Sequence, residues 1–82
     1  MLKYADKYTF TNIATGATCH TFALITSDSE RIKAECGVAD VPGGVHVSGL
    51  IYTVRCGQWD NVPRVALALG LTVSITPYPY NA

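Results

Sequence analysis

Glycine and proline divide this chain into short segments, and this division limits the possible folds more than any other feature. Turn signals stand at Gly16, Gly37, residues 42–44 and Gly70, between runs of strand or helix length. With 82 residues, such a chain has room for one core and for no second domain. The sequence therefore predicts a single small domain over residues 1–82, built from short strands and helices.

The first half of the chain contains a β-hairpin pattern. Residues 8–13 and 18–26 are rich in β-branched and aromatic side chains, and such runs favour strands. Gly16 lies between them and supplies the positive φ angle that a tight turn needs. In the second run Phe22 and Leu24 would share one face by alternation. We expect one face of this hairpin to be core.

Two further strands are expected later in the chain. Residues 45–56 alternate between apolar and polar side chains, but the alternation shifts phase at Gly49. A β-bulge at Gly49 would bring both halves onto one face; without a bulge, the strand would be central and covered on both sides. Residues 71–75 alternate cleanly, and this last strand is expected to stop at Pro77 and Pro79.

Two helices are expected between these strands. Ser27 and Glu30 have the spacing of a capping box, which predicts a short helix that ends at Gly37. The second helix has Asp60 as its N-cap and Pro63 in its first turn, where the missing N–H breaks no helical bond. Apolar residues recur through it at helical spacing, so we expect it to be the main core helix.

The expected order is β-β-α-β-α-β. The strand, helix and strand over residues 45–75 suit a right-handed parallel crossover. The sequence therefore predicts an α+β fold, a two-layer sandwich in which one mixed four-stranded sheet carries two helices on one face.

Charged side chains are unusually few. Six Lys and Arg balance six Asp and Glu, so that 15% of residues are charged and the net charge is zero, where about 25% is typical. Nucleic acids and anionic membranes bind clusters of positive charge, and a chain with no net charge offers no excess of it. Neither is therefore an expected partner. Because a neutral surface lacks self-repulsion, the composition favours a protein partner or a homodimer. The alternative is a surface solvated by Ser and Thr hydroxyls.

The expected location is the cytoplasm. No stretch approaches the roughly 20 apolar residues that span a bilayer, and residues 1–6 lack the apolar core of a signal peptide. The three cysteines, Cys19, Cys36 and Cys56, are odd in number and widely spaced. They do not indicate a disulfide framework.

No motif for a metal or a cofactor is visible. Zinc ligands usually come in close pairs, whereas Cys19 and His20 are strand neighbours that point to opposite faces. We therefore expect no metal, no cofactor and no catalytic residue. One enzymatic alternative stays open: Cys56, expected at a strand end before a helix, could act as a nucleophile with His46 or His20.

Aromatic and proline residues at the ends of elements are the candidate binding residues. Proline stiffens residues 77–80, so that Tyr78 and Tyr80 are presented at low entropic cost. Trp59 precedes the second helix, and Arg55 and Arg64 could complete a patch with it. The alternative is structural: Trp59 covers the core and the tail packs along its own sheet.

In its size, expected location and lack of catalytic motifs, the chain resembles the small accessory proteins that bacteriophages encode against host functions, anti-CRISPR inhibitors among them. This resemblance implies a non-enzymatic protein-binding module that inhibits a host protein complex. The remaining hypotheses are the cysteine-dependent enzyme or redox protein and a self-assembling structural subunit.

Overall fold

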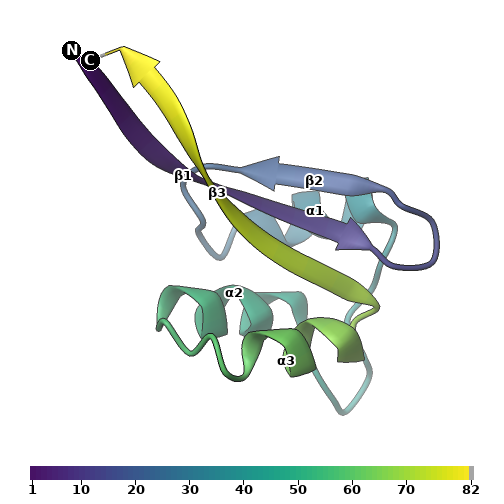
Figure 1. Cartoon of the computed structure of the whole chain (residues 1–82). Helices are drawn as coiled ribbons and strands as arrows, with labels where there is room; N and C mark the ends of the chain where they lie inside the picture. The colour runs from purple at the N-terminus through teal and green to yellow at the C-terminus, as the bar shows by residue number, and fades with distance from the viewer. Residues whose placement is uncertain (82) are drawn as a thin grey trace.

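A three-stranded antiparallel sheet is the scaffold of the computed structural model, which describes residues 1–81. In chain order the elements are β1 (Leu2–Asn12), β2 (Thr18–Thr21), α1 (Asp28–Cys36), α2 (Val47–Arg55), α3 (Val62–Ala68) and β3 (Leu71–Asn81). The strand order is β2-β1-β3, and the helices pack on one face of the sheet (Figure 1). The protein is thus α+β, as the sequence predicts.

The mixed four-stranded sheet with two helices is wrong, because the segment expected as a strand over residues 45–56 contains the helix α2 (Val47–Arg55) instead. Buried apolar side chains recur in α2 with the spacing i, i+3, i+4 and i+7, which is one face of a helix. These residues are Val47, Leu50, Ile51 and Val54. The shift in the apolar pattern at Gly49 therefore reflects the period of a helix and not a β-bulge. Without a strand there, the parallel crossover is wrong as well.

One buried cluster fills the space between the sheet and the helices. Its largest fully buried side chains come from both strands and helices: Phe10, Ile32, Leu50, Ile51 and Leu71. Removing such side chains from water supplies most of the favourable free energy of folding. Because α2 buries more residues than α3, the expectation that the helix between Asp60 and Gly70 is the main core helix is also wrong.

The end of β3 differs from the expectation that prolines stop it. β3 continues through Pro77 and Pro79 to Asn81 and pairs with β1 along its whole length. Proline cannot donate to a ladder, so it is tolerated where its missing N–H points away from the partner strand. β3 is an edge strand, and this position makes its prolines compatible with pairing.

The outer parts of β1 and β3 project from the body of the protein. β2 ends at Thr21, opposite Tyr8, so residues 2–7 and 76–81 continue as a two-stranded ribbon that we call the arm. The arm extends away from the helices, with the two chain ends at its tip (Figure 1). It gives the molecule an elongated shape, 47 Å by 25 Å by 20 Å.

The ends of α1 agree only partly with the capping pattern. The helix follows Ser27, but the Ser27 side chain makes no capping hydrogen bond, and Glu30 forms an ion pair with Lys33 at 3.0 Å instead. Gly37 ends the helix with φ 68°, as expected. The helix boundary is therefore confirmed, while the capping box is wrong.

The start of α3 lies one residue away from the expected cap. Asn61, not Asp60, is the N-cap residue, and Pro63 occupies the first turn. Gly70 follows the helix with φ 76° and leads directly into β3. The turn residues therefore mark this helix correctly to within one position.

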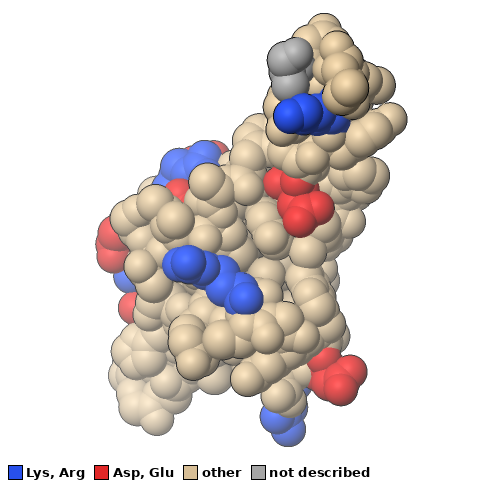
Figure 2. Space-filling view, turned by 90° about the vertical axis from the view of Figure 1, so that its left-hand side faces the viewer, with Lys and Arg blue, Asp and Glu red and all other residues tan. Residues whose placement is uncertain are grey.

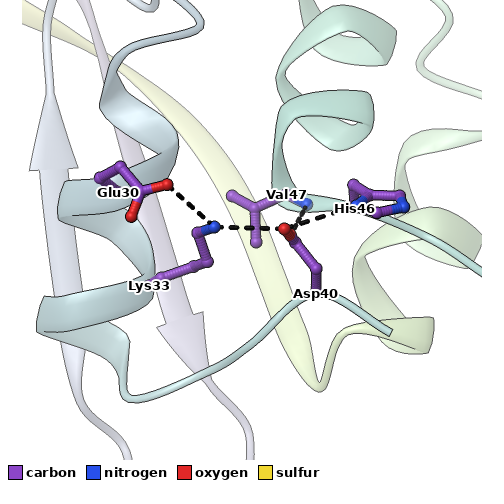
Figure 3. A network of polar contacts seen from close by, with 5 residues as sticks. All are labelled: Glu30, Lys33, Asp40, His46 and Val47. Carbon is purple, nitrogen blue, oxygen red and sulfur yellow. Dashed lines mark hydrogen bonds and ion pairs between the residues drawn. The ribbon is translucent and has the colours of Figure 1, made fainter. Parts of the chain in front are cut away.

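A polar network around Asp40 joins α1 to α2 (Figure 3). The Asp40 carboxylate accepts the Val47 N–H at 2.8 Å and the Lys33 ammonium at 3.1 Å, and it lies 3.4 Å from His46 Nδ1. The Val47 N–H and the Lys33 contact hold the pKa of Asp40 below its ordinary value. The Lys33 ammonium donates hydrogen bonds to the carboxylates of Glu30 and Asp40, and these contacts raise the pKa of Lys33. Asp40 thus supplies the acceptor that the start of α2 needs.

Candidate protein-binding site

Aromatic side chains gather on the outer face of the arm. In an antiparallel ribbon, residues directly opposite each other share a face, and Ala5 lies opposite Tyr78. Phe10 points into the core, so odd-numbered β1 residues such as Ala5 lie on the opposite, outer face. A shallow hollow of about 300 Å³ is lined by Ala5, Tyr78, Tyr80 and Phe22, the residue that follows β2. We call Ala5, Phe22, Tyr78 and Tyr80 the aromatic face.

Two rings of the aromatic face, Phe22 and Tyr78, contact each other, and Tyr78 also contacts a lysine. Phe22 and Tyr78 meet edge to face, with ring centroids 5.0 Å apart and planes at 66°. Lys7 Nζ lies 5.7 Å from the centre of the Tyr78 ring, within the range of a cation–π interaction. Even so, Phe22, Tyr78 and Tyr80 remain 49%, 46% and 43% exposed. The rings of the face are therefore accessible, and the contact between Phe22 and Tyr78 joins two of them.

Two hydrogen bonds hold the segment that presents Phe22. The Asp28 Oδ2 atom accepts the Thr21 hydroxyl at 3.1 Å and the Ile25 N–H at 3.1 Å. These contacts turn the chain out of β2 after Thr21. The expectation that Phe22 and Leu24 share a strand face is wrong, because Leu24 is buried and Phe22 is exposed.

The arm carries few charges. Residues 2–7 and 76–81 include only Lys3, Asp6 and Lys7 as charged side chains. Across the face of the molecule seen in Figure 2, blue and red side chains are sparse and scattered, and uncharged surface separates them. This part of the surface offers no positive cluster of the kind that follows a phosphate backbone.

Two of the five predicted binding residues come together in this site. Tyr78 and Tyr80 lie next to each other on the aromatic face, as their alternation with proline suggests. Phe22 and Ala5 were not among the predicted residues. The only sequence signal for Phe22 was its position near the end of a hairpin strand, and that signal favoured a buried side chain.

Trp59 lies in a different place. It is 40% exposed and lines a groove of about 220 Å³ formed by the start of α3 and the beginning of β3. Ile13 and Leu67 line the same groove and are themselves exposed. Trp59 therefore covers the edge of the core at a site that shares no lining residue with the aromatic face.

The two predicted arginines are also apart from the tyrosines. Arg64 Nη2 donates to Asn61 Oδ1 at 2.9 Å at the start of α3. Arg55 lines a third hollow, of about 360 Å³, with Thr26, Tyr52 and Cys56. The five predicted residues thus occupy several places, and only the tyrosines share one.

The buried thiols are unsuited to nucleophilic chemistry. Cys19 and Cys36 are buried, and the Cys36 thiol donates to the Phe10 carbonyl at 3.4 Å. Burial raises the pKa of Cys36 to about 11 and also raises the pKa of Cys19. A thiol needs a lowered pKa to become a reactive thiolate at neutral pH.

Cys56 is exposed, but it follows the end of α2 and not the end of a strand. Neither histidine lines its hollow. His46 contacts Asp40, and His20 on β2 shares a hydrogen bond of 2.9 Å with the Thr9 hydroxyl on β1. The structure therefore does not assemble the pair that a Cys56 nucleophile would need.

Within residues 1–81, no three His, Cys, Asp or Glu side chains gather in a way that could hold a metal ion. None of the helices in this part of the chain has the length and hydropathy of a membrane span.

Comparisons of the chain with models of known protein families, with curated proteins and with solved structures found no match. Any function must therefore be argued from the site itself.

Proposed function

We propose that the protein is a non-enzymatic binding module that presents the aromatic face of its arm to a protein partner. One observation carries this proposal. Tyr78 and Tyr80 stand on the projecting ribbon, Phe22 packs beside them from the segment that follows β2, and each keeps more than two fifths of its surface exposed. Tyrosine and other aromatic side chains dominate the energetic centres of protein interfaces.

The arm favours binding because its aromatic side chains are already positioned. Tyr78 and Tyr80 lie in a paired strand, and Pro77 and Pro79 restrict the backbone beside them. Because these side chains are already positioned, little conformational entropy is lost when a partner binds them. The low charge of the arm suits a protein surface better than nucleic acid or an anionic membrane.

The proposal is tested by recovering partners with matched variants. The double variant Phe22→Ser, Tyr80→Ser removes two exposed rings from the aromatic face. The control is Tyr52→Ser, which removes an exposed ring from α2. We expect wild type and the control to recover the same protein from a host lysate in equal amounts. The double variant should fail to recover it.

Circular dichroism of each variant verifies that the fold is retained. Equal recovery of every bound protein by the double variant would contradict the proposal. A cytoplasmic location and inhibition of a host complex remain separate predictions. The proposed binding role of the aromatic face does not depend on them.

A further inference from the structure

The direction of the backbone groups of β1 alternates from residue to residue. The Asn12 N–H donates to the Ala17 carbonyl at 2.8 Å, on the side of β2. The next N–H, of Ile13, donates to the Gly70 carbonyl at 2.9 Å, on the side of β3. Because a strand repeats every two residues, even-numbered residues of β1 direct their N–H and C=O groups toward β2, and odd-numbered residues direct theirs toward β3.

β2 does not extend along the arm. Its last residue, Thr21, lies opposite Tyr8. Leu2, Tyr4 and Asp6 therefore direct their backbone N–H and C=O groups toward an edge that no strand of residues 1–81 covers. Such an edge is a template for one more strand.

The other edge of the arm is protected. Pro77 and Pro79 lie opposite Asp6 and Tyr4, so their positions on β3 are the ones whose N–H groups would point outward. Proline has no N–H, and the outer edge of β3 lacks these donors. Only the β1 edge of the arm retains a complete set of donors and acceptors.

We propose that a second copy of this chain pairs with this edge. Residues 2–6 of the two copies run antiparallel about a twofold axis, and Tyr4 lies opposite Tyr4 of the second copy. The arms then form a continuous four-stranded sheet in the order β3-β1-β1-β3. This proposal goes beyond the aromatic face, since it uses the edge of the ribbon and a different partner.

The charges on the arm select this register. Only even-numbered residues can form the hydrogen-bonded pairs, so neighbouring registers differ by two residues. A shift in one direction places Lys3 opposite Lys3 of the second copy, and a shift in the other places Lys3 opposite Lys7. Like charges directly opposite are destabilising. With Tyr4 at the twofold axis, Lys3 lies opposite Ala5, and an aromatic pair forms at the centre.

The shape of the molecule permits this pairing. The arm projects beyond the helices (Figure 1), so antiparallel arms place the two bodies at opposite ends of the joint sheet. Opposite residues in the proposed register have the same parity, and the two aromatic faces therefore lie on one side of that sheet. The paired segment is short, so we expect a weak dimer with a dissociation constant on the order of 100 µM.

The first test measures the mass in solution by light scattering over a dilution series. We expect wild type to rise from 8.8 kDa toward twice that mass with concentration. Tyr4→Pro removes an outward donor and should stay monomeric, whereas Asn81→Pro, at an outward position on the β3 edge, should dimerise like wild type. A wild-type mass of 8.8 kDa up to about 1 mM, or equal dimerisation by Tyr4→Pro, would overturn the proposal.

The second test probes the register and does not depend on proline. Tyr4→Cys and Leu2→Cys are each made in a Cys56→Ser background, because Cys56 is the exposed native thiol. Opposite residues lie about 5.5 Å apart between Cα atoms, which is within reach of a disulfide. Mild oxidation should link Tyr4→Cys into a dimer at least about 10-fold faster than Leu2→Cys, whose thiols are separated by several residues. Equal rates, or no linked dimer from Tyr4→Cys, would overturn the register.

Discussion

The Phe22 ring meets the Tyr78 ring edge to face, with centroids 5.0 Å apart. This contact joins the segment that leaves β2 to the middle of the arm, and it links the part of the sheet that is covered by helices to the part that is not. The position of the aromatic face therefore depends on both the β2 to α1 connection and the arm.

A double-mutant cycle measures this contact. Edge-to-face aromatic pairs are worth about 0.5–1.5 kcal/mol beyond the area that they bury. We expect Phe22→Ala and Tyr78→Ala to show a coupling free energy in that range when unfolding in urea is compared for the single and double variants. Additive effects would show that the two rings do not stabilise each other.

Gly49→Ala is expected to stabilise the protein. Gly49 lies inside α2, and a Cβ atom added there meets no heavy atom within 4 Å. Alanine in a helix interior is favoured over glycine by about 0.5–1 kcal/mol. Chemical denaturation measures the gain, and a loss of stability would contradict the helical assignment of residues 47–55.

Asp40 is expected to make stability depend on pH at the acidic end. Its pKa is lowered in the folded state, from an ordinary 3.8, by the Val47 N–H first and by Lys33. A lowered pKa gives stability that is present above the unfolded value and lost as the pH falls through the folded value.

Thermal melts of wild type and Asp40→Asn test this dependence. We expect the variant to melt at a lower temperature at pH 7, and the difference to shrink steadily below about pH 4. The control is Asp60→Asn, since Asp60 is not the N-cap residue of α3. A difference that stays constant down to pH 2 would contradict the assignment.

The thiols are expected to react in two classes. Cys56 is exposed, whereas Cys19 and Cys36 are buried, with raised pKa values. In a native protein one thiol equivalent should react with an aromatic disulfide reagent within minutes, and all three should react after unfolding. Cys56→Ser should abolish the fast phase. Fast reaction of all three thiols in the native state would show that the core opens easily.

Local turn chemistry was the most predictable part of the fold. Gly16, Gly37 and Gly70 have positive φ angles, and only glycine adopts such angles without strain. Each of them ends or separates an element where the sequence predicts it. These positions depend on the backbone alone, so no knowledge of the tertiary structure is needed to find them.

The identity of residues 47–55 was not predictable from local pattern in the same way. The apolar residues of positions 45–56 also read as two short alternating runs with a phase shift at Gly49, and a β-bulge there was an acceptable explanation. What decides between them is the packing of α2 against α1 and α3 in the shared core, which involves residues from other parts of the chain.

The same distinction between local pattern and tertiary packing applies to the candidate site. Tyr78 and Tyr80 follow from their own sequence context, whereas Phe22 depends on where β2 ends. That end is set by the contact between Thr21 and Asp28, which belong to different elements. The continuation of β3 through Pro77 depends likewise on its edge position, which only the complete sheet defines.

The pairing of Leu2 with Asn81 at the tip of the arm determines how the molecule responds to tension. Force applied between these two residues acts across the ladder, so it opens one residue pair at a time and never loads several hydrogen bonds together. The ribbon should unzip at low force as far as Tyr8, where the sheet becomes three-stranded and the helices begin to resist.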